Sequence, residues 1–500
     1  MKTHKWLKRT LFVIGALVTL VVLALEFENY RGHRAWETCK RELVAEGETL
    51  DWATLPPVAA EQDFLQTPLL APLSKWVVNP KTKVREVNTN VVAQINQLFA
   101  GLAPAREVAA GSWRLGQAVD LAAMQASLRR PAQASDGVLQ ALRATPAGRP
   151  EADLLFVIRQ HATELEEIRA ASHRPHARFG LPSPDLIAVV LPHLSIIKSF
   201  SQTFRIKALA ELAASNPDAA MEDVLAGFRL ANTLREEPFL IATLVEFAVA
   251  DLSVQPLWEG LVRHQWQDRH LAACQVELAR LNFVADMARA LRGERVYCIA
   301  ALEALGHGPT PRPPGEAVPS VFRRLPGGFI DQNKVHIARI IQDSALPILD
   351  PVNRLVDLRA NSRFDAEIDR LSAHKTPYNV FAALLFPALK RVADKVAYVQ
   401  SAVNLAVVAC ALERHRLAEG AYPEKLEALA PRFLPAVPLD TVTGKLPAYR
   451  RTAPDRFTLY AIGLSGEDHG GKLVFEKGKP QLRARDSDWP WPCTAQAPMQ

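Results

Sequence analysis

The 500-residue chain lacks the signatures by which many enzymes and binding proteins are assigned from sequence. It has only five cysteines, an odd number, so at least one stays unpaired or bonds to another chain. None of them has metal-ligand spacing, and so sparse a set predicts a fold held by its core rather than by disulfides. Walker A, dinucleotide-binding and zinc-finger patterns are also missing from the sequence. No nucleotide cofactor and no nucleic-acid partner is therefore expected.

A strong charge of either sign is missing as well. Lysine and arginine total 59, and aspartate and glutamate total 53, which gives a formal net charge of +6. We interpret this as a solvated, mildly basic surface, with contact to anionic lipid or cell-wall polymer as the alternative. With 49% hydrophobic and 22% charged residues, the chain has the composition of a folded protein and the length for two or three domains.

One apolar run is long enough to matter for localisation. It begins at Leu11, ends at Leu25, and approaches the roughly 20 residues of a membrane-spanning helix when Trp6 and Leu7 are counted as an interfacial edge. A cleaved signal peptide is the alternative, but the run ends in LALEF rather than in a small-x-small cleavage site. We therefore expect a retained signal-anchor, through which the chain contacts the membrane.

Charges beside the run predict its orientation. Lys8 and Arg9 adjoin its first end, whereas Glu26 and Glu28 follow its second end. Because basic residues favour the cytoplasmic side, we expect a cytoplasmic N-terminus. The chain is thus predicted to be a single-pass protein of the bacterial inner membrane with its body in the periplasm.

Apolar residues recur at steps of three and four along most of the remaining chain, which predicts a mostly α-helical protein. The body is expected to be a multi-helix bundle or an irregular α-solenoid. In chain order the expected segments are a cytoplasmic basic head (1–10), a transmembrane anchor (11–25), a helical stalk (26–50), an extended and mixed N-terminal region (51–150), a helical body (151–305), a Pro/Gly-rich loop (306–333), a second helical part (334–401), a small α+β C-terminal cap (402–480) and a loose tail (481–500).

Three local patterns give sharper structural predictions. The apolar stretch 239–252 is too short for a second span and carries two carboxylates, so it is expected to be a buried core helix. Asn216 followed by Pro217 is typical of an N-cap and first helical residue. Helices are expected at 335–349 and 352–371, and a long one over 378–418 should be kinked or broken near Pro387.

The C-terminal part resembles the globular end of the major pseudopilin of type II secretion. The resemblance covers residues 402–471: a helix ending in ALERHRLAEGAYPEKLEAL, then Asp440, Gly444 and Tyr449, then LYAIGLSG. It implies a long helix that leads into a turn helix and a small sheet, the pseudopilin-like α+β cap. The prepilin processing site is absent from the N-terminus, so assembly into a pilus is not implied.

The same resemblance supplies the one metal candidate. In the family, a loop of the small sheet binds calcium; here the carboxylates near that loop are Glu467 and Asp468, and Asp440 of the preceding turn could add a further oxygen ligand. Thr441 stands where the family has proline, and Ser465 stands where the loop has an aspartate. Calcium normally takes about six to eight oxygens, so these residues make a weak calcium candidate.

Other stretches are similar to an uncharacterised family of single-pass bacterial envelope proteins. They include AWETCKRELVAEGETLDW, FLQTPLL, ASHRPHARF, LPHL and EPFLIATLV. This resemblance spans most of the chain. It implies a place in the envelope and no known activity.

Two further motifs bear on chemistry. Ser195 and Lys198 match the S-x-x-K of penicillin-recognising enzymes, but the partner S-x-N and K-T-G segments are absent, and an ordinary amphipathic helix is favoured. A basic loop, HRPHARF, is a candidate anion-binding loop because guanidinium groups suit phosphate or carboxylate. The alternative is a capping loop whose arginines bond helix C-terminal carbonyls. Its candidate residues are His173, Arg174, His176 and Arg178.

No catalytic constellation emerges from these patterns. The predicted function is therefore that of a membrane-anchored envelope protein, non-enzymatic, acting as a scaffold through envelope protein partners. The alternative is an envelope or cell-wall hydrolase whose residues converge only in three dimensions. A cleft joining Ser195, Lys198 and a carboxylate would favour the hydrolase, and a broad apolar groove would favour the scaffold.

Overall fold

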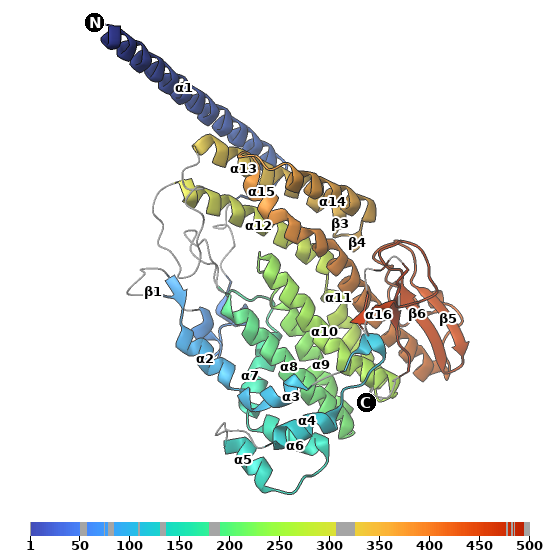
Figure 1. The fold of residues 1–500 in the computed structure, drawn as a ribbon. Helices are drawn as coiled ribbons and strands as arrows, with labels where there is room; N and C mark the ends of the chain where they lie inside the picture. The colour runs from blue at the N-terminus through green and yellow to red at the C-terminus, as the bar shows by residue number, and fades with distance from the viewer. Residues whose placement is uncertain are drawn as a thin grey trace.

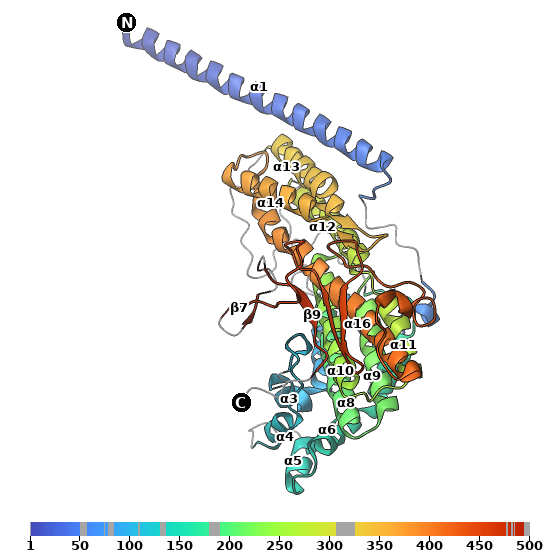
Figure 2. The same ribbon diagram turned by 90° about the vertical axis from the view of Figure 1, so that its right-hand side faces the viewer.

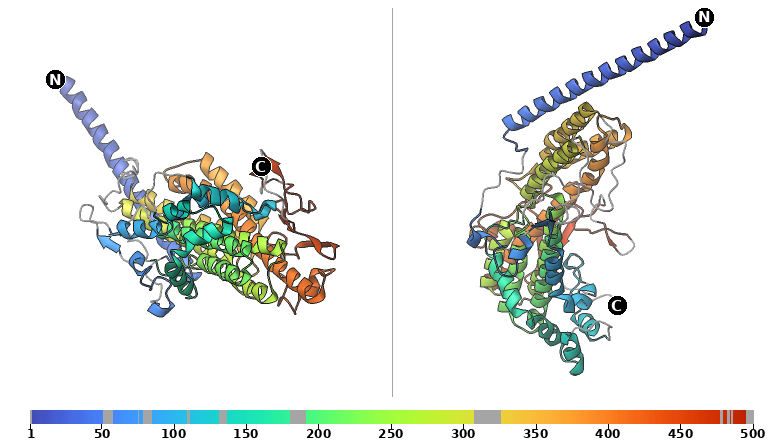
Figure 3. Two further views of the ribbon diagram at one scale, coloured as in Figure 1. Left: turned by 90° about the horizontal axis from the view of Figure 1, so that it is seen from below. Right: turned by 90° about the vertical axis from the view of Figure 1, so that its left-hand side faces the viewer.

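A long helical rod leaves one end of a mostly helical body in the computed structural model of the chain (Figure 1). The structure describes residues 2–50, 58–74, 76–78, 85–108, 111–130, 137–179, 191–306, 326–476, 479–481, 484 and 486–494. The rod is α1 (Lys2–Ala45), whose N-terminal half projects away from the body in every view (Figures 1, 2 and 3). Anchor and stalk therefore form one continuous helix.

The described part of the body is built from helices of very different length. The N-terminal region carries α2 (Thr89–Gln97), α3 (Ala103–Glu107), α4 (Leu121–Arg129) and α5 (Gly137–Ala144). The helical body contains α6 (Pro150–Arg159), α7 (Ala162–Ser172), α8 (Pro192–Ala213), α9 (Pro217–Asn232), α10 (Leu240–Val262), α11 (Asp268–Arg280) and α12 (Phe283–Gly306). The later part contains α13 (Gly327–Arg339), α14 (Leu358–Ala373), α15 (Val380–Leu385) and α16 (Val392–Glu419).

The strands are short and pair antiparallel. The larger sheet has the order β5-β6-β9, with β5 (Ala448–Ala453), β6 (Arg456–Ala461) and β9 (Trp489–Trp491). The two-stranded ribbons are β1 (Trp76–Val78) with β2 (Arg85–Val87), β3 (Leu349–Asp350) with β4 (Leu355–Val356), and β7 (Phe475–Glu476) with β8 (Lys479–Pro480).

Several helix ends lie at positions that the local sequence predicts. Asn216 caps α9 by accepting a hydrogen bond from the Ala219 N–H at 3.5 Å, and Pro217 is the first helical residue, as predicted. The expected break near Pro387 is also confirmed, because a 3-10 segment, Phe386–Arg391, separates α15 from α16. Gly420 ends α16 with a φ of 79°, a left-handed conformation that favours glycine.

Several boundaries differ from the predictions. The loop expected over 306–333 ends earlier, since α13 already begins at Gly327; residues 307–325 lie outside the described residues. The helix expected over 335–349 leaves α-geometry through a π-helical turn, Ile340–Ala345, and the helix expected at 352 starts at Leu358 because the β3–β4 hairpin intervenes.

The tail expected to be loose contributes a strand to the sheet, which corrects that prediction for residues 489–491. Trp489 and Trp491 are each only 3% exposed, because their rings pack against aromatic neighbours on other elements. Trp489 lies 5.2 Å from the Tyr398 ring of α16, and Trp491 lies 5.2 Å from the Trp113 ring, between centroids. Burial of two large aromatic side chains fixes a segment whose prolines had suggested disorder.

One hydrophobic core joins most of the described body. It runs without interruption from Phe64 near the N-terminal side to Trp491 in β9, and α16 passes through it between α10, α11 and the sheet (Figure 2). Residues 402–419, expected in the C-terminal cap, are part of α16 and largely buried in this core. Cap and helical body therefore share their interior.

Three helical stretches are long and apolar enough to cross a membrane, judged by length and composition among the described residues. The apolar window of Arg9–Ala45 has no buried share, whereas 61% of the window in Leu240–Val262 and all of that in Val380–Glu419 are buried in the protein. The interpretation of 239–252 as a core helix is thus confirmed. Only the first stretch has the exposure that a lipid-facing helix needs.

The crossing of α12 with the α9–α10 connection gives a direct test of this packing. A Cβ on Gly293 would lie 1.8 Å from the Pro238 carbonyl oxygen, so Gly293→Ala forces two backbones apart. We expect the free energy of unfolding to fall by about 1–3 kcal/mol, as measured by urea titration of the detergent-solubilised chain. Gly137→Ala is the matched control, since nothing lies within 4 Å of its Cβ position, and it should not destabilise. Equal losses in both variants would contradict the packing.

Candidate functional site

The second half of α1 lies along α13 as a parallel helix pair. The Gly328 N–H donates to the Asn29 side chain at 2.9 Å, and the Gln342 side chain donates to Glu46 at 2.8 Å. Between these, Arg339 pairs with Glu42. The two residues of each pair are 299, 296 and 297 positions apart in the sequence. This nearly constant separation means that the two helices run in the same direction. The segment predicted as a stalk is therefore docked on the body rather than free, and we call this contact the α1–α13 junction.

Two glycines let the helices touch backbone to backbone at the end of the junction nearest the apolar run. A Cβ on Gly32 would lie 2.3 Å from the Gly328 carbonyl oxygen, and a Cβ on Gly328 would lie 2.2 Å from the Glu28 carbonyl oxygen. Any larger side chain at either position would separate the helices. Further along, a small core of its own fills the contact, made by Trp36, Cys39, Leu43, Ile299 and Ala338.

Charged groups close the far end of the junction. Arg295, which is fully buried, donates to the Glu48 carboxylate at 2.5 Å, and Arg292 donates to it at 3.0 Å. Burial acts to raise the pKa of Glu48, but hydrogen bonds from the two guanidinium groups outweigh it and hold the pKa below its ordinary value. Glu48 is therefore ionised at neutral pH, and it ties the end of α1 to α12.

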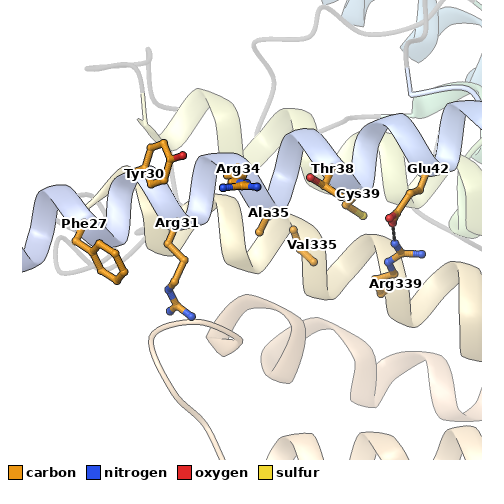
Figure 4. A pocket seen from close by; sticks show the side chains of 10 residues that line it. All are labelled: Phe27, Tyr30, Arg31, Arg34, Ala35, Thr38, Cys39, Glu42, Val335 and Arg339. Carbon is orange, nitrogen blue, oxygen red and sulfur yellow. Dashed lines mark hydrogen bonds and ion pairs between the residues drawn. The ribbon is translucent and has the colours of Figure 1, made fainter.

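A groove of about 600 Å³ runs along the outer side of the junction (Figure 4). Its lining comes from one face of α1 and from two side chains of α13. The residues are Phe27, Tyr30, Arg31, Arg34, Ala35, Thr38, Cys39, Glu42, Val335 and Arg339. The α1 members recur at steps of three and four, a signal present in the sequence but read there only as a stalk.

A second polar feature lies inside the body, between α10 and α12. Glu246 is fully buried, and burial together with the neighbouring Asp286 carboxyl raises its pKa well above the ordinary value. Burial also raises the pKa of Asp286, against the opposing charge of Arg289, which donates to it at 2.7 Å. Burial therefore favours the protonated form of Glu246, whereas Arg289 favours the ionised form of Asp286. This pair was not predicted from the sequence, because its members come from different helices.

His193 and Glu237 form a second buried pair at the start of α8. The His193 Nε2 atom lies 3.7 Å from the Glu237 carboxylate, and the His193 ring stacks on Phe179 at 4.1 Å between centroids. Burial lowers the pKa of His193 to about 3 and raises the pKa of Glu237 to about 8. Both groups are therefore mostly uncharged at neutral pH, and the contact between them is not an ion pair.

The candidate anion-binding loop lies between α7 and α8, and each of its candidate residues contacts protein groups. His173 meets Arg229 at 3.0 Å, and His176 meets Glu236 at 2.9 Å. Two arginines of the loop complete the set: Arg174 donates to the Asp63 and Gln66 carbonyls at 2.9 and 2.8 Å, and Arg178 pairs with Glu236 at 3.3 Å. The loop thus fastens the segment 63–66 to the α9–α10 connection.

The other residues that the sequence suggested as candidates are either hydrogen-bonded within the protein or exposed. The Ser195 hydroxyl donates to the Pro192 carbonyl at 2.8 Å, and both Ser195 and Lys198 are exposed on α8. Asp440 is buried and accepts hydrogen bonds from the N–H groups of Val442, Thr443 and Ile462 at 2.7 to 3.0 Å.

The three calcium candidates are not assembled into a metal site. Asp468 accepts from the Tyr460 hydroxyl and the Gly470 N–H, both at 2.8 Å, while Glu467 is exposed. Within the described residues, no three His, Cys, Asp or Glu side chains are grouped so that they could hold a metal ion. Asp440 instead stabilises the turn between α16 and the sheet through its hydrogen bonds to backbone N–H groups.

The glycine contact of the junction can be tested directly. Gly32→Val places a branched side chain against the Gly328 backbone, so α1 should leave α13. We expect trypsin to cut the variant at Lys40 or Arg41 much faster than the parent, because an undocked helix opens more readily. Gly15→Val in the same helix has nothing within 4 Å of its Cβ and should cleave like the parent. Unchanged cleavage of the Gly32 variant would contradict the junction.

The raised pKa of Glu237 predicts a pH-dependent stability. In the unfolded chain this carboxyl ionises above pH 4.5, whereas in the fold it keeps its proton up to about pH 8. The folded state binds the extra proton, so this stability contribution is present below pH 4.5 and is lost as the pH rises to 8. Glu237→Gln should therefore stabilise the protein at pH 8 relative to pH 5, by an amount on the order of a few kcal/mol.

The measurement is urea unfolding of parent and variant at pH 5, 6.5 and 8. Glu236→Gln is the neighbouring control: it loses contacts to His176 and Arg178 and should gain no stability at pH 8. A gain for Glu237→Gln that is the same at every pH would show that ionisation of this carboxyl is not involved.

No protein-family model, curated protein or solved structure matches this chain. The resemblance of residues 402–471 to the major pseudopilin therefore stays a prediction, and so does the resemblance to single-pass envelope proteins. The structure itself shows an exposed apolar helix, a docked junction with an open groove, and two buried pairs of titratable side chains.

Proposed function

We propose that the chain is a single-pass protein of the bacterial inner membrane, with its body in the periplasm, that works as a non-enzymatic scaffold through contacts with envelope proteins. The observation that carries the proposal is the contrast in exposure among the apolar helices. The window in α1 has no buried share, whereas 61% of the window in α10 and all of that in Val380–Glu419 are buried. An apolar helix exposed on all sides is stable in lipid and not in water.

The α1–α13 junction supports an anchored role in a second way. Because α1 is one helix from Lys2 to Ala45, the docked half and the exposed half have a common axis. A body held by backbone contact at Gly32 and by the Glu48 ion pairs stays close to the membrane surface. That geometry suits a protein that presents a fixed surface to partners.

An envelope or cell-wall hydrolase is the alternative, and one observation favours it. The buried Glu246 carboxyl has a raised pKa, as a general acid needs, and the Asp286 carboxyl lies beside it. Glu246 is fully buried, however, so a substrate would reach it only after α10 and α12 part. A scaffold requires no such opening and is the function we favour.

A topology assay tests the proposal. Alkaline phosphatase is fused to the C-terminus of the full chain, which leaves β9 intact, and the fusion is produced in a bacterial membrane. We expect phosphatase activity, and cleavage of the body when protease is added to spheroplasts. Reversing the flanking charges with Lys8→Glu, Arg9→Glu and Glu26→Lys should lower the activity. An inactive and protease-protected fusion of the parent chain would overturn both the compartment and the orientation.

A further inference from the structure

The groove along the α1–α13 junction opens at the end of the apolar run. Its first lining residues are aromatic and basic: Phe27 and Tyr30, each 64% exposed, and the guanidinium groups of Arg31 and Arg34. Figure 4 shows them following one another along α1, with Val335 and Arg339 of α13 beside the far part of the groove. Aromatic and basic side chains at the boundary of a span are typical of the headgroup layer.

The position of these side chains along α1 sets their depth. At about 1.5 Å per residue, Arg31 lies about 9 Å beyond Leu25 and Arg34 about 14 Å beyond it, and tilt of the helix brings both closer to the bilayer. Side chains on a helix lean toward its N-terminus, which in α1 is the membrane end. Long basic side chains also extend to the nearest polar layer. Both guanidinium groups therefore reach toward lipid headgroups.

Only some of the charged side chains that line the groove have a partner of opposite charge. Arg31 bonds Glu28 at 2.7 Å and lies 5.2 Å from the centre of the Tyr378 ring, and Arg339 pairs with Glu42. Arg34 is exposed and makes no hydrogen bond or ion pair within the described part of the chain. The groove thus keeps one uncompensated cation at its membrane end. An anion is the complementary ligand.

The geometry points to the headgroup of an anionic phospholipid as the occupant of this groove, with its phosphate on Arg34 and Arg31. This assignment rests on the proposed membrane anchoring. The apolar part of the lipid has a matching surface on the other side of the arginines, because Phe27 and the exposed apolar residues 11–25 continue from the groove toward the acyl layer. The guanidinium fork matches phosphate oxygens.

A second copy of the chain fits the groove less well. In a two-fold pairing of parallel α1 helices along this face, Arg31 and Arg34 would approach their own copies. Like charges opposed in this way are unfavourable. A lipid brings the opposite charge and is already present around the span.

The test uses the full chain in nanodiscs made from an equal mixture of phosphatidylcholine and phosphatidylglycerol, with native mass spectrometry of the lipids that remain bound after release. We expect the parent to retain phosphatidylglycerol preferentially. Arg34→Gln should lower that preference about fivefold, the effect of one basic residue at an anionic surface. Arg41→Gln is the matched control on the same helix, because Arg41 does not line the groove and should leave the preference unchanged.

Each other outcome overturns the assignment. Equal losses in the Arg34 and Arg41 variants would show a diffuse surface charge instead of a site, and displacement of the lipid by added inorganic phosphate would show a site for the free anion. A chain that emerges as a dimer without bound lipid would assign the groove to a second copy. Failure of the chain to enter nanodiscs would instead overturn the membrane anchoring itself, which keeps the two proposals distinguishable.

Discussion

The backbone contact between Gly32 and Gly328 is the constraint on which the placement of the body depends. Two helices separated by nearly 300 residues of sequence approach so closely there that neither position has room for a Cβ. Every other feature of the junction follows from that approach: the small core around Trp36, the ion pairs at Glu42 and Glu48, and the groove left on the outer side. Without the two glycines, α1 would be a tether rather than a structural helix.

The pKa values of carboxyl groups inside the body are set differently from those at the junction. At Glu48, hydrogen bonds from two arginines lower the pKa of the carboxyl, whereas at Glu237 and Glu246 burial dominates and raises the pKa. Ion pairs therefore fasten the α1–α13 junction, whereas burial sets the pKa of these two acids inside the body.

What the sequence could predict was local. The N-cap at Asn216, the break at Pro387 and the burial of α10 follow from residues that lie next to one another in the chain. The junction could not be predicted in this way, because a glycine offers no side chain from which a partner can be read. The role of the C-terminal tryptophans was hidden for a related reason, since Pro490 and its neighbours suggest a loose tail while the rings decide the outcome by long-range packing.

The candidate site divides along the same line. The groove residues of α1 stand at helical spacing in the sequence, yet only the position of α13 turns that face into a groove. The candidate residues of the HRPHARF loop were found from composition, and the structure shows which protein groups they contact. The residue types in the sequence indicated which interactions were chemically possible, but only the fold shows which groups are in contact.

Strand β9 has a consequence for the order in which the protein takes shape. The Trp258 indole N–H in α10 donates to the Pro492 carbonyl at 2.7 Å, and Trp491 packs on Trp113, so the last described residues complete a core begun hundreds of residues earlier. In the order of synthesis, α1 comes hundreds of residues before this strand. The core around α10 is therefore complete only when this strand has been synthesised, long after α1 has left the ribosome.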